Sequence, residues 1–127
     1  MLPCRHGFAA PRVLVVEDEG LVATIVVDLL MDEGYEVERM HNGRSALVLV
    51  QIWTPCLILL DIMMPVMDGQ RFLSEIERLE HLAAVPVVVV SGAGGPMLAN
   101  LGMRVADVIR KPFDVDRLVA TVARLAT

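Results

Sequence analysis

The chain has 127 residues, a net charge of −5, and 55% hydrophobic residues of which few are aromatic. This length fits about one domain, and its apolar share suffices for one core of aliphatic side chains. The acidic balance, with no cluster of Lys and Arg, argues against a nucleic-acid-binding surface. No apolar run approaches the roughly 20 residues that cross a bilayer, so we expect no membrane partner either.

Residues 1–11 are expected to form a tail before the first strand, and residues 12–127 to form the domain. The tail is too short and too weakly apolar for a secretory signal. Cys4 lies in the tail and Cys56 in an apolar run, a spacing that gives neither a disulfide framework nor a metal site. A reducing cytoplasm is therefore the expected location.

Short β-branched runs alternate with stretches of helical period along the domain. We expect strands at residues 12–16, 35–40, 56–60, 86–90 and 107–110, and helices at 20–33, 43–53, 69–82, 97–103 and 114–125. Strict alternation with right-handed crossovers predicts an α/β fold, a doubly wound parallel sheet with helices on both faces. In this architecture ligands bind outside the carboxyl ends of the strands.

The first helix is apolar almost all round. Its core-facing stripe is predicted at Val22, Ile25, Val26 and Leu29, with Ala23, Val27 and Met31 continuing the apolar surface beside it. A helix without a polar face is usually covered by another surface. That cover would be a kinase, a phosphotransfer protein or a second copy of this chain; alternatively, a valine-rich composition simply extends onto the surface.

Polar side chains follow four of the predicted strands: Glu17, Asp18 and Glu19 the first, Asp61 the third, Ser91 the fourth and Lys111 the fifth. Crowded carboxylates repel one another unless a cation lies between them, and hard oxygen ligands suit Mg²⁺. A carboxylate beside Mg²⁺ and a lysine can attack phosphorus, because the cations offset charge on the phosphoryl oxygens. The hydroxyl of Ser91 would then hydrogen-bond the transferred group.

These residues resemble the receiver domain of two-component response regulators, a CheY-like domain. The resemblance is carried by "VLVVEDE", "LILLDIMMPVMDG", "VVVVSG" and "KPF" in that order, and it runs from about Arg12 to Ala126. It implies a flavodoxin-like fold with the strand order 2-1-3-4-5.

The resemblance also implies a role for each matching residue. Asp61 would be the phosphoacceptor, Glu17 and Asp18 the acidic pair that holds Mg²⁺, and Met63 the source of a backbone carbonyl ligand. Ser91 matches the switch hydroxyl, and Lys111 matches the phosphate-contacting lysine that precedes a cis bond to Pro112. Asp68 and Gly69 are interpreted as cap and turn residues.

The function that this resemblance implies is two-component signal transduction. A histidine kinase or histidine phosphotransfer protein would donate the phosphoryl group, and the phosphoprotein would signal by protein contact or by phosphorelay. It would catalyse only its own aspartyl phosphorylation and dephosphorylation. Because the chain ends at Thr127, close to the last predicted helix, we expect a single-domain regulator.

The sequence departs from the family at three places. Val108 stands where receivers usually carry a tyrosine or phenylalanine, and a valine has no ring to rotate when the domain is phosphorylated. The segment between Ser91 and Lys111 is short, which leaves a fourth helix of about two turns. Glu17 is longer than the commoner aspartate, which affects the geometry of the metal site.

Two other functions are open at this point. A pseudo-receiver, acting as a phosphorylation-independent interaction or dimerisation module, is favoured by Val108 and opposed by the complete set of site residues. A phosphatase with an aspartyl-phosphate intermediate would need a second acid two residues after Asp61, and that position is Met63.

Overall fold

The computed structural model describes residues 10–62, 69–92 and 105–126. In these ranges five parallel strands form one sheet in the order β2-β1-β3-β4-β5. The strands are β1 (Arg12–Val16), β2 (Glu36–Met40), β3 (Leu57–Leu60), β4 (Val87–Ser91) and β5 (Val105–Arg110). The predicted α/β class and the flavodoxin-like strand order are therefore confirmed. Each predicted strand lies within two residues of its observed bounds.

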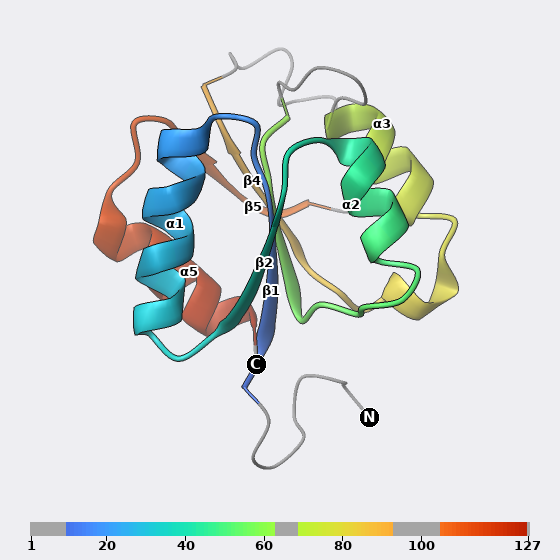
Figure 1. Ribbon diagram of the computed structural model, residues 1–127, viewed down its shortest axis with the longest axis horizontal. Helices are drawn as coiled ribbons and strands as arrows, with labels where there is room; N and C mark the ends of the chain where they lie inside the picture. The colour runs from blue at the N-terminus through green and yellow to red at the C-terminus, as the bar shows by residue number, and fades with distance from the viewer. Residues whose placement is uncertain (1–9, 63–68, 93–104, 127) are drawn as a thin grey trace.

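Helices cover both faces of the sheet (Figure 1). Helices α1 (Gly20–Asp32) and α5 (Val115–Leu125) pack on one face, and α2 (Gly43–Leu49) and α3 (Gly69–Ile76) pack on the other. Alternate side chains of β1, such as Val15 and Val16, enter opposite cores. Strands that are buried on both faces need apolar residues at every position, which accounts for their unbroken apolar runs.

Two helices end earlier than their apolar period suggests. Helix α2 ends at Leu49 rather than 53, and α3 ends at Ile76 and is followed by a separate 3₁₀ turn, Glu80–Leu82. In both places the backbone tightens: the amide of Ile52 donates to Leu49 and that of Leu79 to Ile76, each at 3.0 Å. Leu82 still packs in the core, so the apolar spacing continues past the point where the helix stops. The predicted helix 97–103 lies outside the described residues.

The buried face of α1 differs from the predicted stripe. Ala23, Val26 and Leu30 are its buried residues, whereas Ile25 is 44% exposed and Leu29 is half-buried. A helix so rich in apolar residues fits the core spacing in more than one rotation, so the apolar pattern alone did not determine which face is buried. The polar residues mark it better, because Thr24, Asp28 and Asp32 are all exposed at intervals of four.

Within the described residues, the histidines and cysteines form neither a disulfide nor a metal-binding cluster. His41 and His81 are exposed, and Cys56 is a buried free thiol. Cys4 and His6 lie outside the described residues. Across the described ranges, no helix combines the length and the apolar character that spanning a bilayer requires.

Candidate functional site

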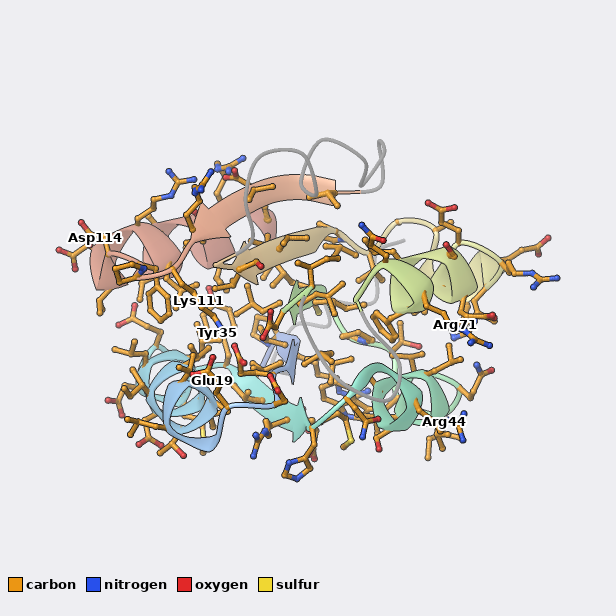
Figure 2. All side chains as sticks on the ribbon, turned by 90° about the horizontal axis from the view of Figure 1, so that it is seen from above. Glu19, Tyr35, Arg44, Arg71, Lys111 and Asp114 are labelled. Carbon is orange, nitrogen blue, oxygen red and sulfur yellow. The ribbon has the colours of Figure 1, made fainter. Side chains whose placement is uncertain are left out.

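The predicted site residues lie where the carboxyl ends of four strands meet. Glu17 directly follows β1, Asp61 follows β3, Ser91 is the last residue of β4, and Lys111 follows β5. Figure 2 looks onto this edge of the sheet and labels Lys111 and Glu19 near each other. Parallel strands thus gather side chains that are far apart in the sequence.

Glu17, Asp18 and Asp61 form an acidic cluster. One carboxylate oxygen of each lies within 4.8 Å of the others. Glu17 and Asp61 are each only 4% exposed, while Asp18 is open to solvent. Hard oxygen donors with one side open to water fit Mg²⁺, which usually keeps several of its waters. The structure therefore brings these three residues together as expected, and their role as metal ligands stays a prediction. Met63 and its carbonyl lie outside the described residues.

Backbone hydrogen bonds to neighbouring strands hold the two buried carboxylates in place. The amide of Asp61 donates to the carbonyl of Val16 at 2.9 Å, and the amide of Glu17 donates to the carbonyl of Met40 at 3.1 Å. Both residues therefore extend the sheet by one step beyond the last strand pair. The backbone at both carboxylates is therefore anchored to the neighbouring strands.

Lys111 supplies the positive charge beside these acids. Its ammonium lies 2.8 Å from Glu17 and 3.4 Å from Asp61, and it is 3.7 Å from the more exposed Glu19. The amide of Lys111 donates to the carbonyl of Ser91 at 3.0 Å, which ties the ends of β4 and β5. The bond from Lys111 to Pro112 is cis, as the family resemblance implies.

The burial of this cluster changes the ionisation of two residues. Burial raises the pKa of Glu17 from 4.5 to about 7; the hydrogen bond from Lys111 opposes this rise, and the nearby Asp61 adds to it. Burial lowers the pKa of Lys111, but the hydrogen bond to Glu17 and the charge of Asp61 outweigh it, so the net shift is upward. Lys111 thus keeps its charge, while Glu17 exchanges its proton near neutral pH.

The free energy of unfolding of the metal-free protein should fall as the pH rises from 5 to 8. Between the unfolded pKa of Glu17 at 4.5 and its folded pKa of about 7, the folded protein holds a proton that the unfolded chain releases. The stability that this bound proton contributes is lost as the pH rises through 7, and the free energy of unfolding falls by on the order of 2 kcal/mol. Urea unfolding at several pH values in the presence of a chelator measures it.

The matched control for this effect is Glu17→Gln, which keeps the shape of the side chain and cannot titrate. Its stability should depend less on pH over the same range than that of the wild type. Equal slopes in both proteins would show that Glu17 does not titrate near neutral pH.

Ser91 and Val108 lie on neighbouring strands. Ser91 is fully buried at the end of β4, next to the strand that leads into Asp61, and the role of its hydroxyl stays a prediction. Val108 is half-buried on β5 and packs against the core beneath α2 and α3. Because this position carries a valine, it has no aromatic ring that could rotate when the domain is phosphorylated. The short segment after Ser91 lies mostly outside the described residues.

One residue at the site was missed by the reasoning from sequence. Arg39, near the end of β2, donates from Nε and Nη2 to the backbone carbonyl of Glu17, at 3.0 and 2.8 Å. The strand pairing explains this contact, because Arg39 lies opposite Val15 in the parallel ladder of β1 and β2. The expected strand order already placed β2 beside β1, and only the register was lacking to find Arg39.

Comparison with known proteins is consistent with this geometry. The family model described as "Response regulator receiver domain" matches residues 13–123. The chain belongs to this family. The receiver shares 30% identity over 114 residues with the chemotaxis protein CheY of Bacillus subtilis, covering 89% of this chain and 95% of that protein. It also matches the CheY4 structure of Vibrio cholerae at a TM-score of 0.84 and 29% identity, covering 92% of this chain and 99% of the other.

Longer relatives contain the receiver as one part of the protein. The receiver is 30% identical over 117 residues to the DNA-binding dual master transcriptional regulator RpaA of Synechocystis, covering 91% of this chain and 48% of RpaA. It spans about half the length of the first curated relatives that it matches, between 48% and 56% of each. The relatives therefore establish a receiver domain of two-component signalling.

Proposed function

We propose that this receiver accepts a phosphoryl group on Asp61 from the phosphohistidine of a histidine kinase or phosphotransfer protein, in a reaction that requires Mg²⁺. The observation that carries the proposal is the buried Asp61 carboxylate with Lys111 3.4 Å away and two further acids within 4.8 Å. Such a site supplies a nucleophile, a fixed cation and a place for a second cation.

The chemistry follows from these positions. Bound Mg²⁺, held by Glu17, Asp18 and Asp61, would offset the negative charge on the phosphoryl oxygens. A carboxylate oxygen of Asp61 forms the new bond to phosphorus, while the bond from phosphorus to the imidazole nitrogen breaks and its electron pair returns to the ring. Lys111 donates to a phosphoryl oxygen, and the Ser91 hydroxyl binds another.

The output is proposed to be protein contact or onward phosphotransfer, followed by slow self-catalysed hydrolysis. Val108 leaves no aromatic ring to report phosphorylation, so the loop after Ser91 would carry the signal. The exposed side chains of α1, Leu21, Ile25 and Met31, offer a surface for the kinase, the phosphotransfer protein or a second copy. The lack of a disulfide framework favours a cytoplasmic location.

Intact mass after incubation with acetyl phosphate tests the proposal. The wild-type chain should gain one phosphoryl group in the presence of Mg²⁺ and none after Mg²⁺ has been removed by a chelator. If neither acetyl phosphate nor a phosphohistidine donor adds the group, the proposal fails and an interaction module without phosphorylation becomes the better account.

A further inference from the structure

Arg39 holds the backbone of Glu17 rather than a carboxylate. Its guanidinium donates two hydrogen bonds to one acceptor, the carbonyl oxygen of Glu17, at 3.0 and 2.8 Å. The amide of the same residue donates to the carbonyl of Met40. Both backbone polar groups of Glu17 are therefore held by β2, the neighbouring strand at the edge of the sheet.

The carbonyl that Arg39 holds belongs to the peptide unit that joins Glu17 to Asp18. A peptide unit is planar, so fixing the direction of its oxygen also fixes the direction in which the chain enters Asp18. Glu17 and Asp18 contribute two of the three carboxylates in the acidic cluster. Their relative orientation therefore depends on the peptide plane that Arg39 holds.

Arg39 and Lys111 act on different parts of Glu17. The carboxylate of Glu17 pairs with Lys111 at 2.8 Å, whereas across the described ranges Arg39 has no carboxylate within ion-pair distance. An arginine has a planar fork of donors in fixed geometry, which orients an acceptor more strictly than the single ammonium of a lysine. The contact of Arg39 is therefore suited to orienting the peptide.

The surroundings of Arg39 leave space for substitutions. Its side chain is half-buried and lines a shallow groove with Ala23, Thr24, Val27 and Asp28 of α1. A shorter or uncharged side chain can therefore replace it without creating a closed cavity in either core. Effects on the metal site can then be separated from loss of the fold.

We propose that Arg39 is a positioning residue of the Mg²⁺ site, which holds the peptide between Glu17 and Asp18 so that both carboxylates point toward the metal. The inference rests on the proposed function, because it takes Mg²⁺ as the ligand of this cluster. Residues that orient metal ligands typically affect metal affinity by 10–100-fold when they are replaced.

The test compares Arg39→Lys and Arg39→Met with Arg44→Met, which removes an exposed arginine of α2. Mg²⁺ dissociation constants are measured by calorimetry at pH 8 and urea unfolding is measured in parallel. The amide of Glu19 donates to the Glu17 carboxylate at 3.2 Å. The rate of hydrogen exchange of this amide, measured without metal, therefore shows how firmly residues 17–19 are held.

Both Arg39 variants should bind Mg²⁺ about tenfold more weakly than the wild type and exchange the Glu19 amide faster. Arg44→Met should match the wild type in both measurements. The direction of the change in Mg²⁺ affinity separates two mechanisms. Loss of a positive charge alone would tighten the binding of a cation, whereas loss of positioning weakens it. Arg39→Lys keeps the positive charge and removes only the planar pair of guanidinium donors.

The inference is overturned if both Arg39 variants bind Mg²⁺ within twofold of the wild type, even when their unfolding free energies fall. It is also overturned if Arg39→Met binds Mg²⁺ more tightly. If the wild type still gains a phosphoryl group in these cases, only the positioning role fails. A wild-type chain that binds no Mg²⁺ overturns the positioning role and the proposed function together.

Discussion

The Asp61→Asn variant should gain no phosphoryl group and should nevertheless be more stable than the wild type without Mg²⁺. The first result follows because an amide in place of the carboxylate leaves no nucleophilic oxygen anion at the end of β3. The expected loss of phosphorylation is complete. Intact mass after incubation with acetyl phosphate and Mg²⁺ measures it.

The gain in stability comes from the surplus of negative charge at the site. Asp61 is 4% exposed, and its negative charge raises the pKa of Glu17 by opposing the ionisation of that carboxyl. Lys111 loses one partner in the variant but keeps Glu17 at 2.8 Å. Removing one buried charge from an acidic cluster should raise the free energy of unfolding by about 1 kcal/mol at pH 8. Urea unfolding with a chelator measures this change.

The two measurements make the loss of phosphorylation interpretable, because a more stable variant is a folded one. Asp32→Asn serves as the control, since Asp32 is exposed at the end of α1 and away from the cluster. It should be phosphorylated like the wild type. If Asp61→Asn still gained a phosphoryl group, the acceptor would be another residue. If Asp61→Asn were less stable than the wild type, the ion pair between Asp61 and Lys111 would outweigh the repulsion between Asp61 and Glu17.

The sequence was informative about the site because strand ends are easy to locate. Unbroken apolar runs predict strands that are buried on both faces, and the first polar residue after each run lies at the edge of the sheet. Asp61 was placed by this argument, and Lys111 was placed because it directly follows the last predicted strand; the two side chains lie 3.4 Å apart at their nearest atoms. The strand order itself came from the resemblance to receivers, because alternation allows more than one order.

The sequence was less informative where several arrangements satisfy the same pattern. The apolar surface of α1 permitted a core stripe through Ile25, which is in fact 44% exposed. The ends of α2 and α3 depend on a change from one hydrogen-bond spacing to another, and side chains packed in the core do not reveal that change. Arg39 needed the register of β1 against β2, which no single stretch of sequence contains.

Gly69 shows how one residue type can be explained in two ways. From the sequence it was interpreted as a turn residue at the start of a predicted helix 69–82, and the structure places it as the first residue of α3. It is buried there, and its amide donates to the carbonyl of Ile62 at 3.1 Å. A Cβ atom on this residue would lie 2.5 Å from the Cα of Ile62 and 3.0 Å from the carbonyl oxygen of Asp61. The glycine is therefore needed for close approach of α3 to the end of β3.

The Gly69→Ala variant should lose about 3 kcal/mol of unfolding free energy and should also be phosphorylated more slowly. The atom that a methyl group would meet first belongs to the backbone, which cannot rotate aside. Helix α3 cannot easily move away, because Phe72, Leu73 and Ile76 hold it in the core. The strain should therefore displace the Asp61–Ile62 peptide, which carries the proposed phosphoacceptor. Urea unfolding and the rate of the mass gain measure the two effects.

Gly20→Ala is the matched control, because Gly20 is the first residue of α1 and an added Cβ there meets no atom within 4 Å. Replacing this glycine should leave stability unchanged or raise it by up to about 1 kcal/mol, since alanine restricts the unfolded chain and favours the helix. If Gly69→Ala proved as stable as Gly20→Ala, the two helix starts would be equivalent and α3 would not pack closely on β3. A destabilised Gly69→Ala with an unchanged phosphorylation rate would show that the strain is absorbed at Ile62 without moving Asp61. The combined loss is expected because Asp61 and Ile62 share the peptide unit that the methyl group would push against.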